Sequence, residues 1–235
     1  MEGAGLYAAN AAGMWHAAGT PLPADPRYAG FTAYGALRIV LRRPLGAPSI
    51  AAIVAALPAG RMTLEDPYGL AAPQQLPDVM VRRMPVMNRS PRPLPAGRRD
   101  GISVAPVTGP DTLATAERVI VDGFPYPHLQ PWTAGRALSP ELLHAPGWRA
   151  WLAHRDGTPA AAGYTFDDGT ALGVYSLATL PEHRRAGLAR ALLTAMLAAH
   201  PRRTATLVAT EAGRPLYTAL GFTTVSTATW YFRAG

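Results

Sequence analysis

One stretch constrains the fold of this chain more than any other: LATLPEHRRAGLARALL, from Leu177 to Leu193. An apolar run stops at a proline, two arginines and a glycine follow, and an apolar pattern with helical spacing begins after the glycine. The pattern predicts a strand, a cationic turn and the start of a helix. Because helix N-termini have unpaired amides and a partial positive charge, they attract anions. The stretch therefore indicates an α/β protein with an anion site at this turn.

The residues of the turn suit a phosphate group. Successive backbone amides that point inward make a concave site for an anion. Gly187 has no Cβ to obstruct a phosphate that meets the backbone there. Ala189 is small one turn further on, and Arg184 and Arg185 add positive charge. The sequence thus predicts a phosphate-bearing ligand beside this turn.

Composition limits the remaining classes of protein. The 235 residues allow one large domain or two small ones, and the absence of cysteine excludes disulfides, thiolate zinc sites and a cysteine nucleophile. The net charge of +7 comes from arginine, since lysine is absent, and favours a phosphate-bearing ligand, nucleic acid or a membrane surface. No apolar run reaches the roughly 18 residues of a membrane span, and the N-terminal stretch lacks the positive start of a secretory signal. We therefore expect a cytoplasmic protein without a membrane partner, and the abundance of Pro and Gly is typical of a GC-rich bacterial genome.

A proline-rich segment, SPRPLPAGRRDG at residues 90–101, predicts a domain boundary, because proline removes amide donors and disfavours helix in the preceding residue. We expect an N-terminal α/β region over 1–97 and a second domain over 98–235. The elements expected in the first region are a helix over Leu6–Ala18, a strand over Ala36–Arg43, a helix over Ser49–Leu57 with Ser49 as its N-cap, and a strand over Val79–Met87 with Pro85 at an edge or a bulge. None of them carries a catalytic constellation.

The second domain has the more regular pattern, which predicts the order β-α-(α)-β-β-β-α-β-α-β. Its first strand, GISVAPVT, precedes a helix that Asp111 can cap. Asp167-Asp168-Gly169 predicts a hairpin between two strands, and Gly221 closes a short helix at its C′ position. The remaining expected elements are strands at Trp148–His154 and TATLVAT, and a closing strand or hairpin at FTTVSTATWYF.

Two motifs of the second domain resemble those of one family. RRAGLA at residues 184–189 resembles the R/Q-x-x-G-x-G/A acetyl-CoA signature of the GCN5-related N-acetyltransferase (GNAT) superfamily. The preceding Leu177–Glu182 resembles the strand and Pro-Glu turn that usually come before it. Downstream, YTALGF at Tyr217–Phe222 resembles the family's Y-x-x-x-G-F motif at the expected distance. The resemblance extends over Ile102–Phe232.

The resemblance implies a mixed, mostly antiparallel sheet flanked by helices and splayed open between the strands near Thr170–Thr179 and Thr204–Thr210. It implies an acetyl-CoA-dependent N-acyltransferase that transfers an acetyl group directly to a primary amine of a small molecule or peptide, with acetyl-CoA as cosubstrate. Tyr217 matches the family position of the acid that protonates the departing thiolate, and no metal ligand is assigned. The residues that the resemblance places at the cofactor are Leu177, Ala178, Thr179, Arg184, Arg185, Ala186, Gly187, Leu188, Ala189, Arg190 and Thr210.

Two departures from the family pattern leave roles open. Many members carry Asn near the end of the strand before the tyrosine helix, where this chain reads ATE at residues 209–211, so Thr210 or Glu211 substitutes or the contact is lost. Many also carry Glu on the central strand, where Val174-Tyr175-Ser176 has no carboxylate. The base is therefore unassigned. The family's substrate loop falls on VDGFPYPHLQPW, which makes Asp122, Tyr126 and His128 the candidates for contact with the acceptor.

Several alternatives stay open at the level of sequence. The first region is either a degenerate GNAT-like half or an accessory layer that walls the acceptor site or makes a homodimer, and it lacks both motifs, so we expect no cofactor there. The whole protein is either the transferase or a CoA-binding sensor or interaction protein that has lost catalysis. A nucleic-acid-associated basic protein is a third interpretation, although a CoA site alone accounts for the positive charge and the arginine pairs lack interleaved aromatics.

Overall fold

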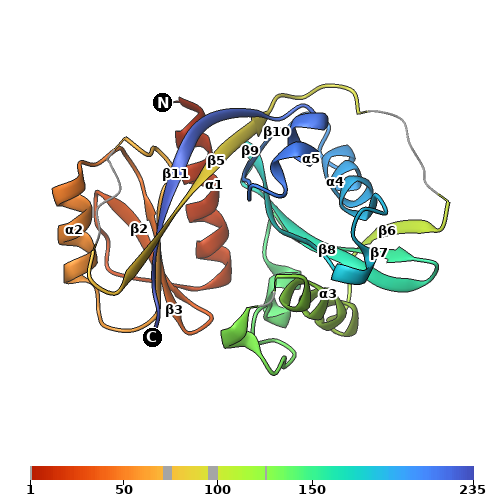
Figure 1. Cartoon of the computed structure of the whole chain (residues 1–235), viewed down its shortest axis with the longest axis horizontal. Coiled ribbons are helices and arrows are strands. Elements are labelled where there is room, and N and C mark those ends of the chain that lie inside the picture. Colours follow the sequence, from red (N-terminus) through yellow and green to blue (C-terminus); the bar gives the residue numbers. More distant parts are fainter. Residues whose placement is uncertain (1, 71–75, 95–99, 125) are drawn as a thin grey trace. The chain divides into compact units, whose positions relative to one another are not determined.

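The computed structural model describes residues 2–70, 76–94, 100–124 and 126–235 (Figure 1). Within these ranges, eleven strands form a mixed, mostly antiparallel sheet, and five α-helices flank it, which confirms the predicted fold class. The chain divides into two compact units, Met1–Arg89 with Thr206–Gly235, and Ser90–Ala205. By contacts, residues 206–235 thus cluster with the first unit, whereas the sequence-based division assigns them to the domain 98–235. No helix in the described part of the chain is long and apolar enough to cross a membrane.

The first unit is built mainly from the N-terminal region. Its strands follow the order β1-β2-β3-β4-β11-β5, and only β3 and β4 pair in parallel among the registers of this run. β10 (Thr204–Val208) begins in the second unit and ends in the first. The elements of the first unit are α1 (Glu2–Ala18), β1 (Thr20–Pro21), β2 (Tyr28–Ala33), β3 (Ala36–Leu41), α2 (Ala47–Ala56), β4 (Met62–Asp66), β5 (Val79–Arg89), α5 (Arg214–Ala219) and β11 (Thr223–Arg233).

The helix α2 begins two residues earlier than its sequence pattern predicts. We expected Ser49 to cap it, which is wrong: Gly46 is the N-cap residue, no side chain caps the helix, and a proline occupies its first turn. Proline suits that position because its fixed φ is helical and its missing N–H would have no intrahelical partner. The apolar stripe itself is as expected, since Ile50 and Ile53 are buried in one cluster with Tyr231 of β11.

The first region contains a strand–helix–strand segment, β3–α2–β4. A strand, a helix and a second strand follow one another, as they do in β9–α4–β10 later in the chain. β3 and β4 pair in parallel without a break, from Leu37 with Met62 to Val40 with Glu65. The backbone N–H and C=O groups on the facing edges of β3 and β4 therefore bond to each other.

The strand β5 is not an edge strand, although it contains Pro85. It pairs with β11 on one side, and the Ala209 N–H donates to the Pro85 carbonyl on the other at 2.9 Å. The register of β11 shifts between Thr224 and Ser226, just beside the proline. Proline cannot donate an N–H to the neighbouring strand, and a bulge lies where the pairing is interrupted. The bulge is one of the two arrangements that the sequence predicts for Pro85.

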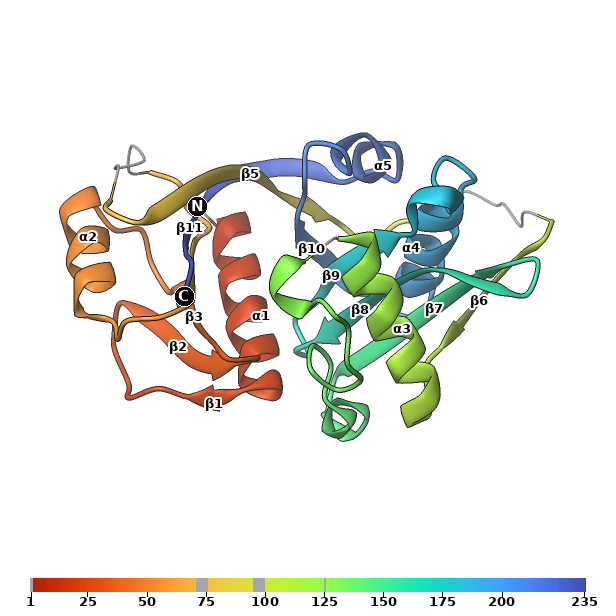
Figure 2. The same cartoon turned by 60° about the horizontal axis from the view of Figure 1, so that its bottom comes forward.

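The helix α5 and the strand β11, which complete the order predicted for 98–235, belong to the first unit. The second unit follows the part of that order that comes before them (Figure 2). Its strands run β9-β8-β7-β6, antiparallel throughout, and α3 and α4 cover opposite faces of them (Figures 1 and 2). Asp111 lies in the first turn of α3 and does not cap it, because Gly109 is the N-cap residue. The elements of this unit are β6 (Ile102–Pro106), α3 (Pro110–Gly123), the 3-10 helices η1 (Pro127–Leu129) and η2 (Pro140–His144), β7 (Trp148–Arg155), β8 (Thr158–Asp167), β9 (Ala171–Thr179), η3 (Pro181–His183) and α4 (Leu188–Ala198).

Candidate active site

The strand β9 has a bulge just before its last residues. Its register with β8 shifts between Ala162 and Tyr164, and Ser176 of β9 has a left-handed φ of +49°. Gly163 lies opposite the bulge, where a Cβ would come within 3.1 Å of the Leu177 Cα. A side chain at this position of β8 would therefore crowd the backbone of β9. A bulge interrupts regular pairing and redirects backbone groups, and such features are frequent beside active sites.

The turn after β9 has two left-handed residues close together. Arg185 has φ +62° and Gly187 has φ +89°. Left-handed backbone costs a residue with a Cβ roughly 1–2 kcal/mol, and strain of this kind gathers at ligand-binding turns. Gly187 is also the N-cap of α4, where no side chain caps the helix and no acid lies in the first turn. The turn thus joins a backbone suited to an anion with the positive end of a helix dipole.

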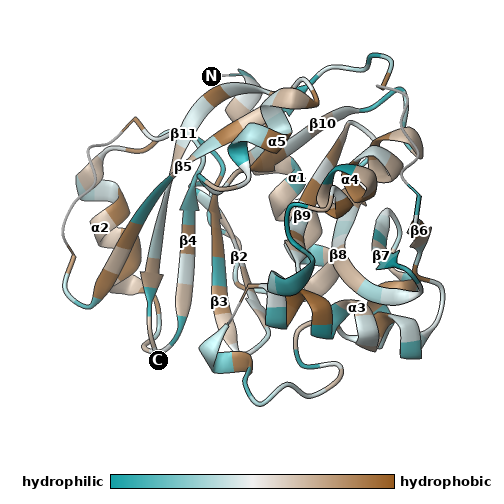
Figure 3. Ribbon diagram, turned by 45° about the vertical axis from the view of Figure 1, so that its right-hand side comes forward, coloured by the Kyte–Doolittle hydropathy of each residue, from teal (hydrophilic) through white to brown (hydrophobic). Residues whose placement is uncertain are grey.

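The helix α4 is fixed firmly behind this turn. Its hydrophobic residues, brown in Figure 3, lie on one stripe. Leu188, Leu192 and Met196 are at most 1% exposed. The amides of the first helical turn are therefore held in place before any ligand binds, which lowers the entropic cost of binding.

Arg184 bonds to carbonyl groups of the protein. Its Nε donates to the Thr179 carbonyl at 3.2 Å, and its Nη2 donates to the Gly123 carbonyl at 3.1 Å. The side chain therefore joins the end of β9 to the last residue of α3. Sequence reasoning placed Arg184 at the cofactor and missed these partners, which come together only in the folded chain.

The remaining predicted cofactor residues of the second unit lie on one continuous segment. Ala178 is buried at the end of β9, with Leu177 and Thr179 half-buried beside it, and Leu188 is buried in α4. The others in the turn and first helical turn, half-buried or exposed, are Arg185, Ala186, Gly187, Ala189 and Arg190. The segment brings these residues together as predicted, and their contact with a cofactor stays a prediction.

The candidate acceptor residue Asp122 already has partners. Gln130 Nε2 donates to its Oδ1 at 3.0 Å, and Arg118 Nε lies 3.5 Å from its Oδ2. The carboxylate therefore ties the last turn of α3 to the segment that follows η1.

Aromatic rings follow directly after α3. Tyr126 stacks on Phe124 with 5.7 Å between ring centroids, and His128 lies 5.6 Å from Tyr126 in a tilted arrangement. Phe124 and Tyr126 are half-buried and His128 is exposed. The structure thus brings the candidates Tyr126 and His128 into one aromatic row.

Glu117 of α3 is a structural carboxylate that sequence reasoning missed. Its side chain is fully buried and accepts backbone N–H groups from Gly135 at 2.8 Å, Ala137 at 2.5 Å and Leu138 at 3.0 Å. A signal was present, because Glu117 falls on the apolar stripe of the helix, four residues after the buried Leu113. The carboxylate holds residues 135–138 against α3.

Tyr217, the predicted acid, belongs to the first unit. It lies on α5, is 8% exposed, and packs edge-to-face on Phe222 with 5.8 Å between centroids. The Phe222 N–H donates to the Tyr217 carbonyl at 3.0 Å, and Gly221 between them has φ +87°. Burial raises the pKa of Tyr217 to about 12. The phenol therefore keeps its proton at neutral pH and is able to donate it.

Thr210, also in the first unit, has a local partner. Its Oγ1 accepts the Gly213 N–H at 3.1 Å at the entry to α5. Gly213 in turn approaches Tyr217 so closely that a Cβ there would lie 2.9 Å from its ring. Thr210 and Glu211 are both exposed. Thr210 thus helps to place the tyrosine helix, and its contact with the cofactor stays a prediction.

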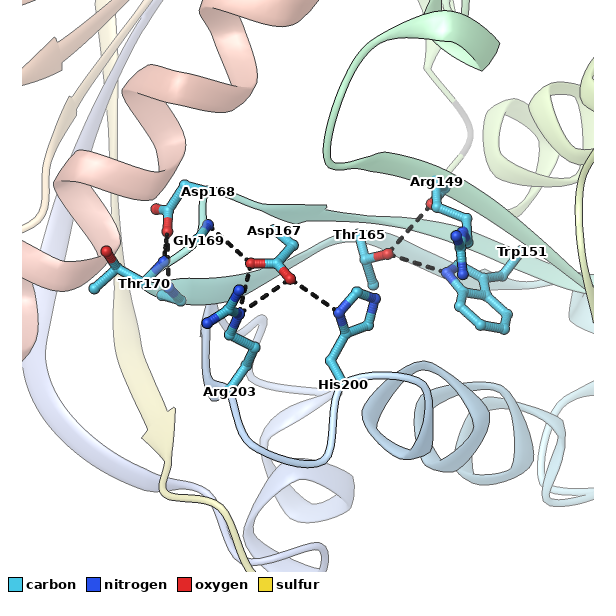
Figure 4. A network of polar contacts seen from close by, with 10 residues as sticks. Arg149, Trp151, Thr165, Asp167, Asp168, Gly169, Thr170, His200 and Arg203 are labelled. Carbon is cyan, nitrogen blue, oxygen red and sulfur yellow. Dashed lines mark hydrogen bonds and ion pairs between the residues drawn. The ribbon is translucent and has the colours of Figure 1, made fainter.

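A polar network lies at the opposite end of α4 from the turn (Figure 4). Arg203 Nε donates to both carboxylate oxygens of Asp167, at 2.9 and 3.1 Å, and His200 Nδ1 lies 3.1 Å from Oδ2. Burial acts to raise the pKa of Asp167, but the Gly169 N–H and Arg203 outweigh it and hold the pKa below its usual value. The network fastens the β8–β9 hairpin to the chain after α4. In the described residues no group of three or more His, Asp or Glu side chains is placed to hold a metal ion.

The bulged strand, the left-handed turn and the uncapped helix form a strand–turn–helix whose backbone geometry suits an anionic ligand. Residues 146–224 match the family model described as "Acetyltransferase (GNAT) domain". This confirms the resemblance: the chain contains a GNAT acetyltransferase domain. A comparison with curated proteins finds no match.

Solved structures share the fold over most of the chain. A GCN5-related N-acetyltransferase from Kribbella flavida is 17% identical with a TM-score of 0.63, over 99% of this chain and 96% of that one. A putative GNAT-family acetyltransferase from Novosphingobium aromaticivorans is 20% identical with a TM-score of 0.56, over 91% of each chain. A GCN5-related N-acetyltransferase from Sphaerobacter thermophilus is 17% identical with a TM-score of 0.58, over 88% of this chain and 76% of that one. At these identities the likeness concerns the fold.

Proposed function

We propose that this protein is an acetyl-CoA-dependent N-acetyltransferase that transfers the acetyl group directly to a primary amine of a small molecule or peptide. The observation that carries the proposal is the turn at Arg185 and Gly187, with its two left-handed residues at an uncapped helix start. In this assignment the pyrophosphate of acetyl-CoA lies on the amides of residues 185–190. The pantetheine arm pairs with the backbone of Leu177 and Thr179, beyond the bulge of β9.

The chemistry follows from the groups that these residues offer. The neutral amine attacks the thioester carbon, a C–N bond forms, and the C–S bond breaks as the thiolate leaves. A backbone N–H near the bulge at Ser176 stabilises the developing oxyanion. Tyr217, whose phenol is protonated at neutral pH, donates its proton to the departing thiolate. The ammonium proton leaves to water or to a base that is not assigned.

In the same proposal, residues 98–235 form the catalytic domain and residues 1–97 are a structural, degenerate GNAT-like half. The amine acceptor enters along the segment that carries Asp122, Tyr126 and His128. The positive net charge of +7 is accounted for by the anionic cofactor.

A CoA-binding sensor without turnover is the second candidate. It is favoured by the lack of a carboxylate at Val174–Ser176 and by the partners that Asp122 already has. Product formation with any amine separates the two functions.

Calorimetry with acetyl-CoA tests the cofactor site. We expect micromolar binding by the wild type and a loss of more than about 100-fold in Gly187→Glu, because a carboxylate would repel the pyrophosphate. The matched control is Gly157→Glu, since Gly157 also has a left-handed φ, +80°, and lies in the β7–β8 hairpin with open space around it. Its affinity should stay within about 3-fold of wild type.

The outcomes separate the possibilities. If wild type does not bind acetyl-CoA, or if both glutamate variants weaken binding equally, the assignment of the turn fails. If binding holds, an amine screen beside Tyr217→Phe follows. Acetylated product from wild type and at least about 10-fold less from Tyr217→Phe is the result expected of a proton donor.

A further inference from the structure

The guanidinium of Arg184 bridges two elements that the sequence separates by more than fifty residues. One partner is the Thr179 carbonyl at the end of β9, and the other is the Gly123 carbonyl at the end of α3. The last carbonyl groups of a helix have no N–H partner within the helix, and they carry its negative partial charge. Arginine is suited to them because its planar fork offers several donors in a fixed geometry. The side chain therefore acts as a tie at the C-terminus of α3.

The two elements also touch directly at this point. Gly123 is buried, and a Cβ there would lie 2.9 Å from the Ala178 Cβ and 3.5 Å from the Thr179 N atom. No larger residue would fit without a shift of one backbone. The end of α3 and the end of β9 are thus packed as one piece, and Arg184 closes the contact on its exposed side.

The chain leaving this contact is the candidate acceptor segment. The Phe124 N–H closes α3 on the Ile120 carbonyl at 3.0 Å, and the rings of Phe124, Tyr126 and His128 follow in a row. Gln130 returns to the last turn of α3 through its bond to Asp122. A displacement of Gly123 would therefore carry the whole segment with it.

We propose that Arg184 is a positioning residue that couples acetyl-CoA binding to the acceptor segment, and that its guanidinium does not bind the pyrophosphate. The proposal rests on the proposed function. Cofactor bound along Thr179 and the turn would fix the Thr179 carbonyl, and Arg184 would pass that restraint to Gly123. The phosphate charge would be met by the backbone amides, with Arg185 and Arg190 nearby.

Hydrogen exchange of the full chain with and without acetyl-CoA tests the coupling. The amides followed are those of residues 119–124, 126 and 128–130, since Pro127 has no N–H. Calorimetry gives the affinity of each variant for acetyl-CoA. In wild type, acetyl-CoA should slow their exchange by about 5-fold or more. In Arg184→Met this ligand-dependent slowing should disappear, while the affinity stays within about 3-fold of wild type.

Two further variants make the result specific. Arg184→Lys keeps a cation able to donate to carbonyls and should restore part of the slowing. Arg202→Met is the matched control, since Arg202 is exposed and lies beyond the far end of α4; it should behave as wild type. A merely structural role would speed exchange equally with and without acetyl-CoA, and would leave the difference unchanged.

Three results would overturn the coupling. A loss of affinity above about 10-fold in Arg184→Met would make the side chain a cofactor ligand. Unchanged slowing in that variant would show that Arg184 transmits nothing. Wild type that fails to bind acetyl-CoA would overturn the proposed function together with the coupling, so the two failures are told apart by the wild-type calorimetry.

Discussion

Replacement of Glu117 by alanine tests how residues 135–138 are held against α3. The carboxylate is fully buried and accepts three backbone N–H groups, from Gly135, Ala137 and Leu138. Each hydrogen bond to a charged group contributes about 1.5–3 kcal/mol, and a buried donor left without a partner costs about 1–3 kcal/mol. Gly135 and Ala137 are half-buried, so water can reach part of the freed donors and the cost stays below the sum of these contributions. We expect about 4 kcal/mol, near the upper end for a single substitution.

This destabilisation is measured by thermal and denaturant unfolding. For a chain of this size 1 kcal/mol shifts the melting temperature by roughly 2–4 °C, so Glu117→Ala should lower it by about 10 °C. Glu117→Gln should fall between, because an amide oxygen can accept but the NH2 group would face an N–H donor. Glu141→Ala is the control, since Glu141 is exposed on η2, and its effect should stay within about 0.5 kcal/mol.

A shift of under about 2 °C for Glu117→Ala would refute the reasoning, since it would mean that the three donors find water at no cost. Hydrogen exchange locates the effect. The amides of residues 135–138 should exchange faster in Glu117→Ala, while those of β8 keep the wild-type rate.

Two pH-dependent predictions concern groups with shifted pKa values. Burial raises the pKa of Tyr217 to about 12, above roughly 10 in the unfolded chain. The folded state therefore favours the neutral phenol. This contribution to stability is fully present below pH 10 and is lost, by about 2–3 kcal/mol, as the pH rises towards 12. Denaturant titrations across this range should show a smaller alkaline loss of stability for Tyr217→Phe, and a loss identical to that of wild type would contradict the shift. Burial acts to raise the pKa of Asp167, but the Gly169 N–H and Arg203 hold it below its usual value. Asp167→Asn should therefore destabilise the protein at pH 7, and the difference in stability from wild type should shrink below about pH 4. A stability difference that is constant with pH would refute the ionic role of this carboxylate.

Local signals in the sequence predicted the elements of residues 98–235 well. The strand, turn and helix from Leu177 to Leu193, the hairpin at Asp167–Gly169 and the Gly221 helix end each depend on residues close together in the chain. Proline, glycine and apolar spacing report such local choices directly. The predicted order of elements in this part of the chain is therefore the order observed.

Features that depend on distant residues were missed. β11 pairs with β4 and β5, which precede it by well over a hundred residues, and nothing in its alternating pattern names those partners. The partners of Arg184 and Glu117 were missed for this reason, because they are backbone groups without any residue preference. The start of α2 was placed wrongly because Gly46, with Pro48 in the first helical turn, takes the place of a serine cap.

The place of β11 has a consequence for synthesis of the chain. This strand lies between β4 and β5, so the first unit lacks its central strand until the last residues have been made. The second unit, Ser90–Ala205, is one uninterrupted stretch and has all its strands earlier. On the ribosome the later part of the sequence can therefore finish folding first, while β4 and β5 wait with unpaired edges of the kind that invite aggregation. Removal of residues 223–235 should therefore destabilise residues 1–89 more than residues 90–205.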